Sequence, residues 1–129
     1  MEDDPQVPDW IHNLREDDSG VSRTLGDGLN AEIFPGSNSM LSVVSIDPHS
    51  EGDLHSHPEE QWGVLLEGEC VRVQDGKEVH VQAGDFWHTP ANVEHAIRTG
   101  EESALVLDIF SPPRPEYQSS GSGFAAEEG

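Results

Sequence analysis

A series of short apolar runs between residues 30 and 110 constrains the fold of this chain more than any other feature. None of the runs repeats its apolar residues with a helical period, and Gly, Pro, Asn or Asp separate them at regular intervals. Short strands at such spacing are typical of β-sandwiches and β-barrels. The sequence therefore predicts an all-β protein. The predicted strands are 30–34, 40–46, 61–67, 70–74, 78–82, 86–89, 94–99 and 104–110.

One connection between these runs is specific enough to predict its geometry. Asp75 and Gly76 lie between two runs in which valines alternate with polar residues. A two-residue Asp-Gly loop between such runs is typical of a hairpin turn with positive φ angles. Further on, three prolines between Ser111 and Tyr117 predict an extended segment.

The length of 129 residues corresponds to one domain. We divide the chain into an acidic N-terminal extension (1–20), a β domain (21–117) and a flexible tail rich in Ser, Gly, Ala and Glu (118–129). Within the extension, Trp10, Ile11 and Leu14 are expected to form an apolar edge that packs on the domain.

The charge balance is extreme, with 26 acidic and 6 basic residues and a formal net charge of −20. Such a surface repels nucleic acid and anionic lipid, which excludes both as expected partners. In molar salt the screening length falls to about 3 Å, and self-repulsion fades. We interpret the composition as that of an intracellular protein of a salt-accumulating halophile; an acidic mesophilic protein is the alternative.

Other features concern the cellular compartment. No apolar run approaches the roughly 20 residues of a membrane-spanning helix, and the first residues are acidic where a signal peptide would be basic and then apolar. We therefore expect a cytoplasmic protein. The single cysteine, Cys70, cannot form an internal disulfide and is expected to be a buried, inert thiol rather than a nucleophile.

Four residues distant in sequence are candidates for a metal site. His55 and His57 are two apart, so on an extended backbone both imidazoles lie on one face, about 7 Å apart. With Gln61 and the distant His95 they can surround one divalent metal ion. Imidazole suits zinc, nickel, iron and manganese, so the metal is left open. Two alternatives also stay open: histidines at a barrel mouth bonded to water, and Glu59 or Glu60 in place of Gln61.

The histidines and their surroundings resemble the first of the two motifs that define cupins. That motif contains a Gly, an His-x-His pair, an acidic residue and a second Gly. This chain has His55, His57 and Gly68 at the corresponding positions. It departs from the motif at Gln61, where an acid is usual, and at Gly52, which lies closer to the histidine pair.

The second cupin motif is matched by Gly84, Pro90 and His95, with Asn92 in place of the second Gly. The resemblance covers roughly residues 30–110. It implies a cupin fold, which is a double-stranded β-helix or small jelly-roll barrel. Because small jelly rolls cover their sheet edges by pairing, a homodimer is also expected.

A narrower resemblance links the chain to the KdgF family of small cupins, which act in pectin and alginate breakdown. It rests on the four candidate ligands and on Asp108-x-Phe110-Ser-Pro-Pro-Arg114. The resemblance implies a reaction in which a 4,5-unsaturated uronate monosaccharide, a small anionic sugar, opens to its linear 4-deoxy-5-keto form. It also implies that Asp108 and Phe110 line the active site.

The glutamine at position 61 has a consequence for the metal. Three neutral imidazoles and a neutral amide leave the full +2 charge on the ion, whereas a glutamate would reduce it to +1. Such an ion is a stronger Lewis acid and prefers anionic ligands. It also stabilises a ferric state less well, which disfavours iron-based oxygen chemistry.

The last predicted strand and the segment after it carry the candidate catalytic residues. Asp108 is a lone carboxylate in an apolar run on the same face as Val106 and Phe110, so its pKa should be raised, as suits a general acid/base. A structural aspartate bonded to a backbone amide is the alternative. Arg114 has a fork that can hold a carboxylate, or it forms a surface ion pair. Phe110 can stack on a sugar ring or fill the core; Trp62 is expected in the core.

Three other functions remain possible for a cupin of this kind. A dioxygenase or lyase would use the same ligands, and a polyketide-cyclase-like enzyme would need an aromatic pocket. A non-catalytic sugar-binding cupin would bind ligand without turnover. Asp108 favours an enzyme, because a carboxylate repels an anion that is only to be held.

Overall fold

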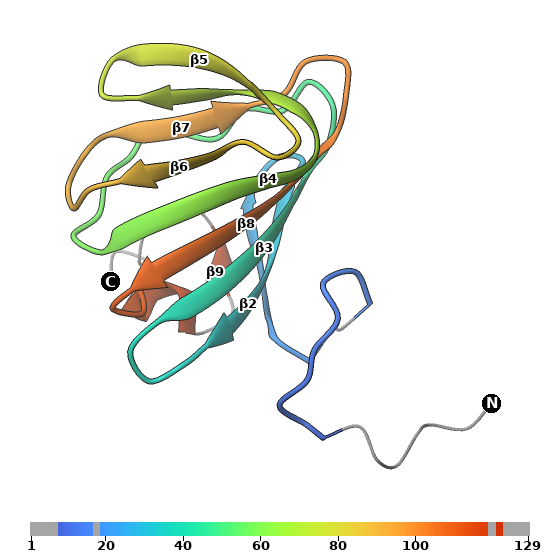
Figure 1. Cartoon of the computed structure of the whole chain (residues 1–129), viewed down its shortest axis with the longest axis vertical. Helices are drawn as coiled ribbons and strands as arrows, with labels where there is room; N and C mark the ends of the chain where they lie inside the picture. Colours follow the sequence, from blue (N-terminus) through green and yellow to red (C-terminus); the bar gives the residue numbers. More distant parts are fainter. Residues whose placement is uncertain (1–7, 17–18, 119–120, 123–129) are drawn as a thin grey trace.

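The computed structural model describes residues 8–16, 19–118 and 121–122 and consists almost entirely of β-strands (Figure 1). The all-β prediction is confirmed. The elements are β1 (Val21–Gly26), β2 (Leu29–Pro35), β3 (Met40–Ile46), β4 (Glu60–Gln74), β5 (Lys77–Gln82), β6 (Phe86–Thr89), β7 (His95–Arg98), β8 (Ala104–Ser111), the 3₁₀ turn η1 (Pro115–Gln118) and β9 (Gly121–Ser122).

The strands form two walls of a small jelly-roll barrel, and β4 belongs to both of them (Figure 1). The first half of β4 pairs with β8 and β6, and its second half pairs with β5 and β7. From β8 the first wall continues through β3, β2 and β1 to β9. All these pairings are antiparallel except that of β1 with β9. The predicted jelly-roll fold is confirmed.

The strand β4 bends in its middle, where the sequence had predicted two separate strands, 61–67 and 70–74. Its register with β8 shifts between Leu65 and Glu67, which marks a β-bulge. Gly68 follows with a φ of +88°, and a Cβ there would overlap the carbonyl oxygen of Ser103. Glycine alone adopts this conformation without strain. The prediction of a break was therefore wrong: the glycine bends one continuous strand from one wall into the other.

The core lies between the two walls and is built from alternate residues of each strand. Its most completely buried apolar side chains are Leu29, Ile33, Met40, Ile46, Leu65 and Val106. Burying a side chain of this size stabilises the fold by roughly 1.5–3 kcal/mol. Cys70 belongs to the same cluster, and burial raises the pKa of its thiol to about 11. The prediction of a buried cysteine is confirmed.

The hairpin turn between β4 and β5 is also as predicted. Asp75 and Gly76 have φ angles of 52° and 78°. By contrast, the segment after β8 is not extended throughout. It contains a cis Ser111–Pro112 bond and the turn η1, which buries Tyr117. Because the turn brings an aromatic ring against the core, the prediction from the prolines alone was wrong.

The terminal segments differ in part from their predictions. Trp10, Ile11 and Leu14 are 73%, 50% and 47% exposed, so the expected packing of an apolar edge is wrong. Instead, Arg15 forms an ion pair with Glu67, and the ring of His12 lies beside that of Phe34. In the predicted tail, 121–122 form β9; residues 119–120 and 123–129 lie outside the described part. The domain limits stay a prediction.

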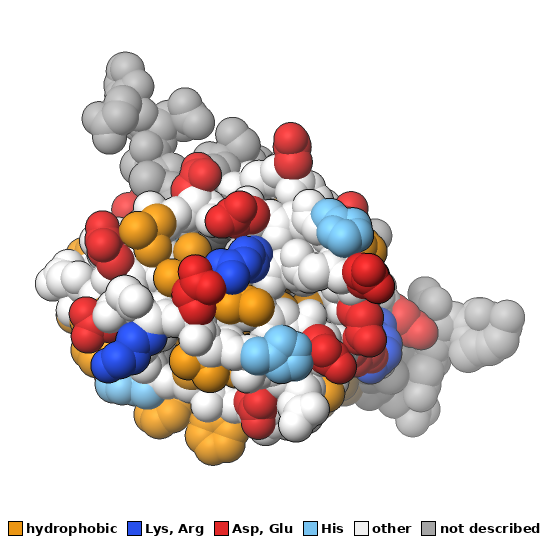
Figure 2. Space-filling view, turned by 90° about the horizontal axis from the view of Figure 1, so that it is seen from above, with side chains coloured by type: hydrophobic (Ala, Val, Ile, Leu, Met, Phe, Trp, Pro, Cys, Tyr) orange, Lys and Arg blue, Asp and Glu red, His pale blue; other side chains and the backbone are white. Residues whose placement is uncertain are grey.

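The outside of the barrel carries the acidic residues and some large apolar ones. Figure 2 shows a face on which acidic side chains far outnumber basic ones. Trp62 is 43% exposed because it points outward from β4, so its expected place in the core is wrong. Phe86 lies near it, with ring centroids 6.2 Å apart. No helix among the described residues has the length and apolarity that crossing a membrane requires.

Candidate metal centre and its pocket

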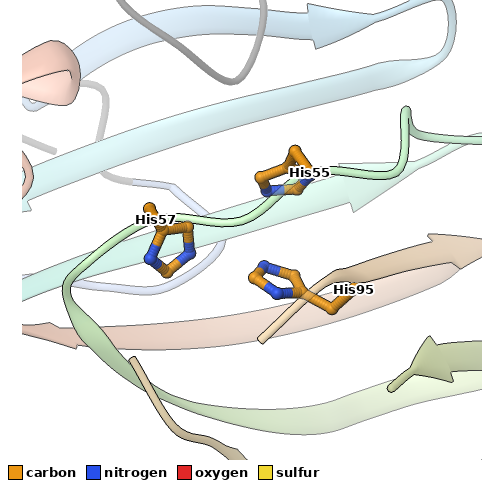
Figure 3. A group of neighbouring side chains, drawn as sticks. All are labelled: His55, His57 and His95. Atoms are coloured by element: carbon orange, nitrogen blue, oxygen red, sulfur yellow. The ribbon is translucent and has the colours of Figure 1, made fainter. Parts of the chain in front are cut away.

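Three histidines meet at one end of the barrel (Figure 3). His55 and His57 lie in the segment that leads from β3 to β4, and His95 begins β7. Two backbone hydrogen bonds join His55 and His95: each amide donates to the carbonyl oxygen of the other residue, with N–O distances of 3.1 and 2.9 Å. The amide of Asn92, which has a φ of +67°, donates to the carbonyl oxygen of His57 at 2.7 Å. Backbone pairing thus brings the two distant motifs together.

The imidazoles are oriented as metal ligands. Candidate ligand atoms of the three rings lie within 4.8 Å of one another. The Nδ1 atom of each ring lies against a backbone carbonyl oxygen, those of Asp53, Glu59 and Val93, at 2.8, 3.0 and 2.8 Å. An Nδ1–H bonded to a carbonyl places the lone pair of the ring on Nε2. The backbone therefore selects the tautomer that a metal ion needs.

The environment also keeps the rings neutral. Burial lowers the pKa of His55 to about 4 and that of His95 to about 3, and it lowers the pKa of His57 as well. Positive charge nearby acts in the same direction, chiefly that of Arg114 on His55 and that of Arg72 on His95. Neutral imidazole is the form that binds metal.

Gln61 provides the test of whether a cation fits. Its amide nitrogen donates to Oδ1 of Asp108 at 2.9 Å, so its Oε1 faces Nε2 of His57 at 3.0 Å. Since the Nδ1–H of His57 is directed at the carbonyl of Glu59, two lone pairs oppose each other at this short distance. A cation that both atoms bind removes the conflict. The donor set of three imidazoles and one amide oxygen thus fits a divalent metal.

The alternative ligands are placed elsewhere. The carboxylate of Glu59 is buried behind His57, with Oε1 3.6 Å from Nδ1 of that ring and 3.8 Å from Nε of Arg114. Glu60 points to the outside, where its Oε2 lies 2.6 Å from Nε2 of His88. Neither carboxylate joins the three rings, whereas Gln61 does.

A narrow pocket leads from the metal site into the barrel. Its cavity volume is about 40 Å³, or about 490 Å³ when the space open to solvent is included. Asp108 faces it from β8, on the same side of the strand as Val106 and Phe110. Burial raises the pKa of Asp108 to about 6, while Arg72, Gln61 and Arg114 act in the opposite direction. This carboxyl can therefore exchange a proton near neutral pH.

Phe110 and Arg114 line the pocket as well. The ring of Phe110 meets that of His57 edge-on, with centroids 5.5 Å apart, and is 2% exposed. The guanidinium of Arg114 lies 4.1 Å from the ring centroid of Tyr117, and its Nε is 3.8 Å from Glu59 and 4.0 Å from Glu116. Because Arg114 is only 2% exposed, the alternative of a surface ion pair is wrong.

The sequence analysis missed Arg72, which lines the pocket from the opposite wall. It is 6% exposed and lies on β4 between two valines. Burial lowers the pKa of its guanidinium to about 10, which leaves it protonated at neutral pH. An arginine inside an apolar run, in a chain with only 6 basic residues, was the signal that could have revealed it.

Comparison with known proteins agrees with this geometry. The chain is 27% identical over 103 residues to the pectin degradation protein KdgF of Dickeya dadantii, covering 78% of this chain and 94% of that protein. The solved structure of KdgF from Halomonas sp. matches with a TM-score of 0.68 and 25% identity, over 73% of this chain and 87% of that one. An RmlC-like cupin from Shewanella frigidimarina shares the fold, with a TM-score of 0.72, 24% identity and coverage of 83% and 96%.

The relatives of this chain include enzymes. Two larger ones are dioxygenases, and the chain spans 49% and 34% of their lengths. A family model described as a cupin domain matches residues 42–110, which is more than half of the chain. The chain therefore belongs to the cupin family.

Proposed function

We propose that this cupin is a metal-dependent enzyme that opens a 4,5-unsaturated uronate monosaccharide to its linear 4-deoxy-5-keto form. One observation carries the proposal: the carboxyl of Asp108 faces the pocket and accepts a hydrogen bond from Gln61, whose oxygen lies against His57 of the histidine cluster. This arrangement places an acid/base group beside a cation site. The similarity to two KdgF proteins supports the choice of reaction.

The proposed reaction is an isomerisation, so its atoms balance within the substrate. The hydroxyl at C1 loses a proton, the bond between C1 and the ring oxygen breaks, and C1 becomes an aldehyde. The former ring oxygen stays on C5 as an enolate, and one proton added at C4 gives the 5-keto product. Asp108 accepts the first proton and returns one, ending in its original state. A divalent ion held by His55, His57, Gln61 and His95 supplies Lewis-acid stabilisation of negative charge on a substrate oxygen.

The remaining pocket residues position the sugar. The cavity of about 40 Å³ admits a small group such as a carboxylate, and the ring lies in the open part of the pocket. Phe110 supplies an apolar surface beside His57. Proton transfer by a placed group is worth about 10²–10⁴-fold in rate.

The direct test is loss of the unsaturated-uronate absorbance with metal-replete protein in about 1 M salt. High salt is chosen because a net charge of −20 repels an anionic substrate and the protein itself at low ionic strength. Activity that rises with salt also supports the proposed halophilic origin. Oxygen consumption would instead indicate a dioxygenase, and binding without turnover a non-catalytic sugar-binding cupin.

Gln61→Glu is expected to weaken substrate binding and to strengthen metal binding. The new carboxylate reduces the charge on the ion from +2 to +1, and it lies next to the carboxyl of Asp108. We expect KM to rise about tenfold or more, which corresponds to about 1.4 kcal/mol. The measurements are steady-state kinetics and a metal-chelator competition. An unchanged KM would refute the charge argument.

A further inference from the structure

We propose that Arg72 binds the carboxylate of the sugar acid, forming an anion subsite inside the barrel. This inference rests on the proposed function and names the part of the site that recognises the acid group. Arg72 lies on the half of β4 that pairs with β5 and β7, and it lines the same pocket as Asp108 and His95.

The contacts of Arg72 hold its guanidinium in place without neutralising it. Its Nε donates to Oε1 of Gln74 at 3.2 Å, and its Nη2 donates to Oγ1 of Thr89 at 2.8 Å. Thr89 in turn donates to Gln74 at 2.7 Å, which ties both acceptors together. The guanidinium carbon lies 5.3 Å from the ring centroid of Trp87. All these partners are uncharged.

No carboxylate compensates this cation within the described part of the chain, since no carboxylate oxygen there lies within 4.0 Å of a nitrogen of Arg72. Asp108 acts on it only from a greater distance. A buried cation without a paired anion is costly, and a bound carboxylate would supply the missing charge. The hydrogen bonds to Gln74 and Thr89 do not involve Nη1, which can donate to a ligand.

Arg114, the arginine that the sequence suggested for this role, is placed differently. Its Nε lies near two carboxylates, that of the buried Glu59 at 3.8 Å and that of the half-buried Glu116 at 4.0 Å. Its charge is therefore largely balanced by the protein. Arg72 has the stronger requirement for an anion, and its network orients it before the ligand arrives.

The test compares Arg72→Gln and Arg72→Lys with a matched control, Arg98→Gln. Arg98 lies on the neighbouring strand β7 and pairs with Glu78 at the surface, so its replacement removes the same charge outside the pocket. Binding of galacturonate and of galactose is measured calorimetrically on metal-replete proteins at one salt concentration. The two sugars share a pyranose ring, and only the first carries a carboxylate. KM, kcat, metal content and melting temperature are measured in parallel.

We expect the wild-type protein and Arg98→Gln to prefer galacturonate by about 10–100-fold, as a charge-assisted hydrogen bond would give. Arg72→Gln should reduce this preference to within about threefold and raise KM about 10–100-fold with little change in kcat. Arg72→Lys should keep part of the preference, because the charge remains while the fork is lost. The melting temperature of Arg72→Gln should be no lower than that of the wild type, because a buried unpaired charge is removed.

Two results would overturn the subsite. One is an unchanged preference in Arg72→Gln; the other is a lower melting temperature or lost folding, which would show that Arg72 stabilises the structure. The outcome is separable from that of the proposed function. If the preference for galacturonate depends on Arg72 but the protein does not turn over unsaturated uronates, only the proposed reaction is rejected. If the protein turns them over and Arg72→Gln has an unchanged KM, only the subsite is rejected.

Discussion

Asp108→Asn is expected to fold and to bind metal normally, yet to lose about 10²–10⁴-fold in kcat. The amide has nearly the same shape as the carboxyl, and its oxygen can still accept the hydrogen bond from Gln61 that Asp108 accepts at 2.9 Å. It cannot take up or release the proton that the reaction moves. Because burial raises the pKa of Asp108 to about 6, removing the carboxyl does not remove a strong source of stability.

The matched control for this variant is Asp27→Asn. Asp27 is exposed in the turn between β1 and β2 and does not line the pocket, so the substitution makes the same change in net charge outside it. Rates are measured with the absorbance assay, and metal content is measured on both variants. Full activity in Asp108→Asn would show that Asp108 does not transfer the proton. The main observation in favour of an enzyme would then be lost.

In the metal-free protein, His55 and His95 together are expected to reduce the free energy of unfolding by about 4 kcal/mol between pH 7.5 and pH 5, and Asp108, whose pKa is raised, offsets part of this loss. His55 and His95 have pKa values near 4 and 3 in the folded protein, against 6.5 when unfolded. Below pH 6.5 the unfolded chain binds protons that the folded chain does not, so stability falls as the pH decreases. Each histidine contributes about 2 kcal/mol by pH 5, at 1.36 kcal/mol per pH unit below 6.5.

This effect is measured by denaturant unfolding across pH in about 1 M salt, where changes in self-repulsion are screened. The control is His80→Gln, because His80 is exposed on β5 and outside the cluster. Saturating divalent metal should move the loss of stability to lower pH, since the ligand form of each ring is the neutral one. A metal-free protein equally stable at pH 7.5 and pH 5 would contradict the assignment of these histidines as buried and neutral.

Much of this architecture could be predicted from local patterns. The strands Met40–Ile46 and Phe86–Thr89 and the turn at Asp75 and Gly76 follow from alternation and turn chemistry, which act over a few residues. The histidine pair and the distant His95 were recognisable because a shared ion demands particular residue types at related positions. The structure brings all three rings and Gln61 together.

Other features depended on contacts that no local pattern contains. The burial of Tyr117 arises from packing against Phe110, with ring centroids 5.7 Å apart, and not from the prolines around it. Trp62 is on the outer face although its size suggested the core. Arg114 has one partner near it in the sequence, Glu116, and one far from it, Glu59. Only the fold shows that both carboxylates lie beside the same guanidinium.

The bulge in β4 decides which residues share the interior of the barrel. Gln61 and Arg72 are an odd number of positions apart, so strict alternation would send their side chains to opposite faces. The extra residue between Leu65 and Glu67 changes the parity, and both then line one pocket. A single-residue deletion at that point would turn the guanidinium outward while Gln61 kept its inward direction. An irregularity of one residue thus joins two halves of a recognition site that a perfect strand would have kept apart.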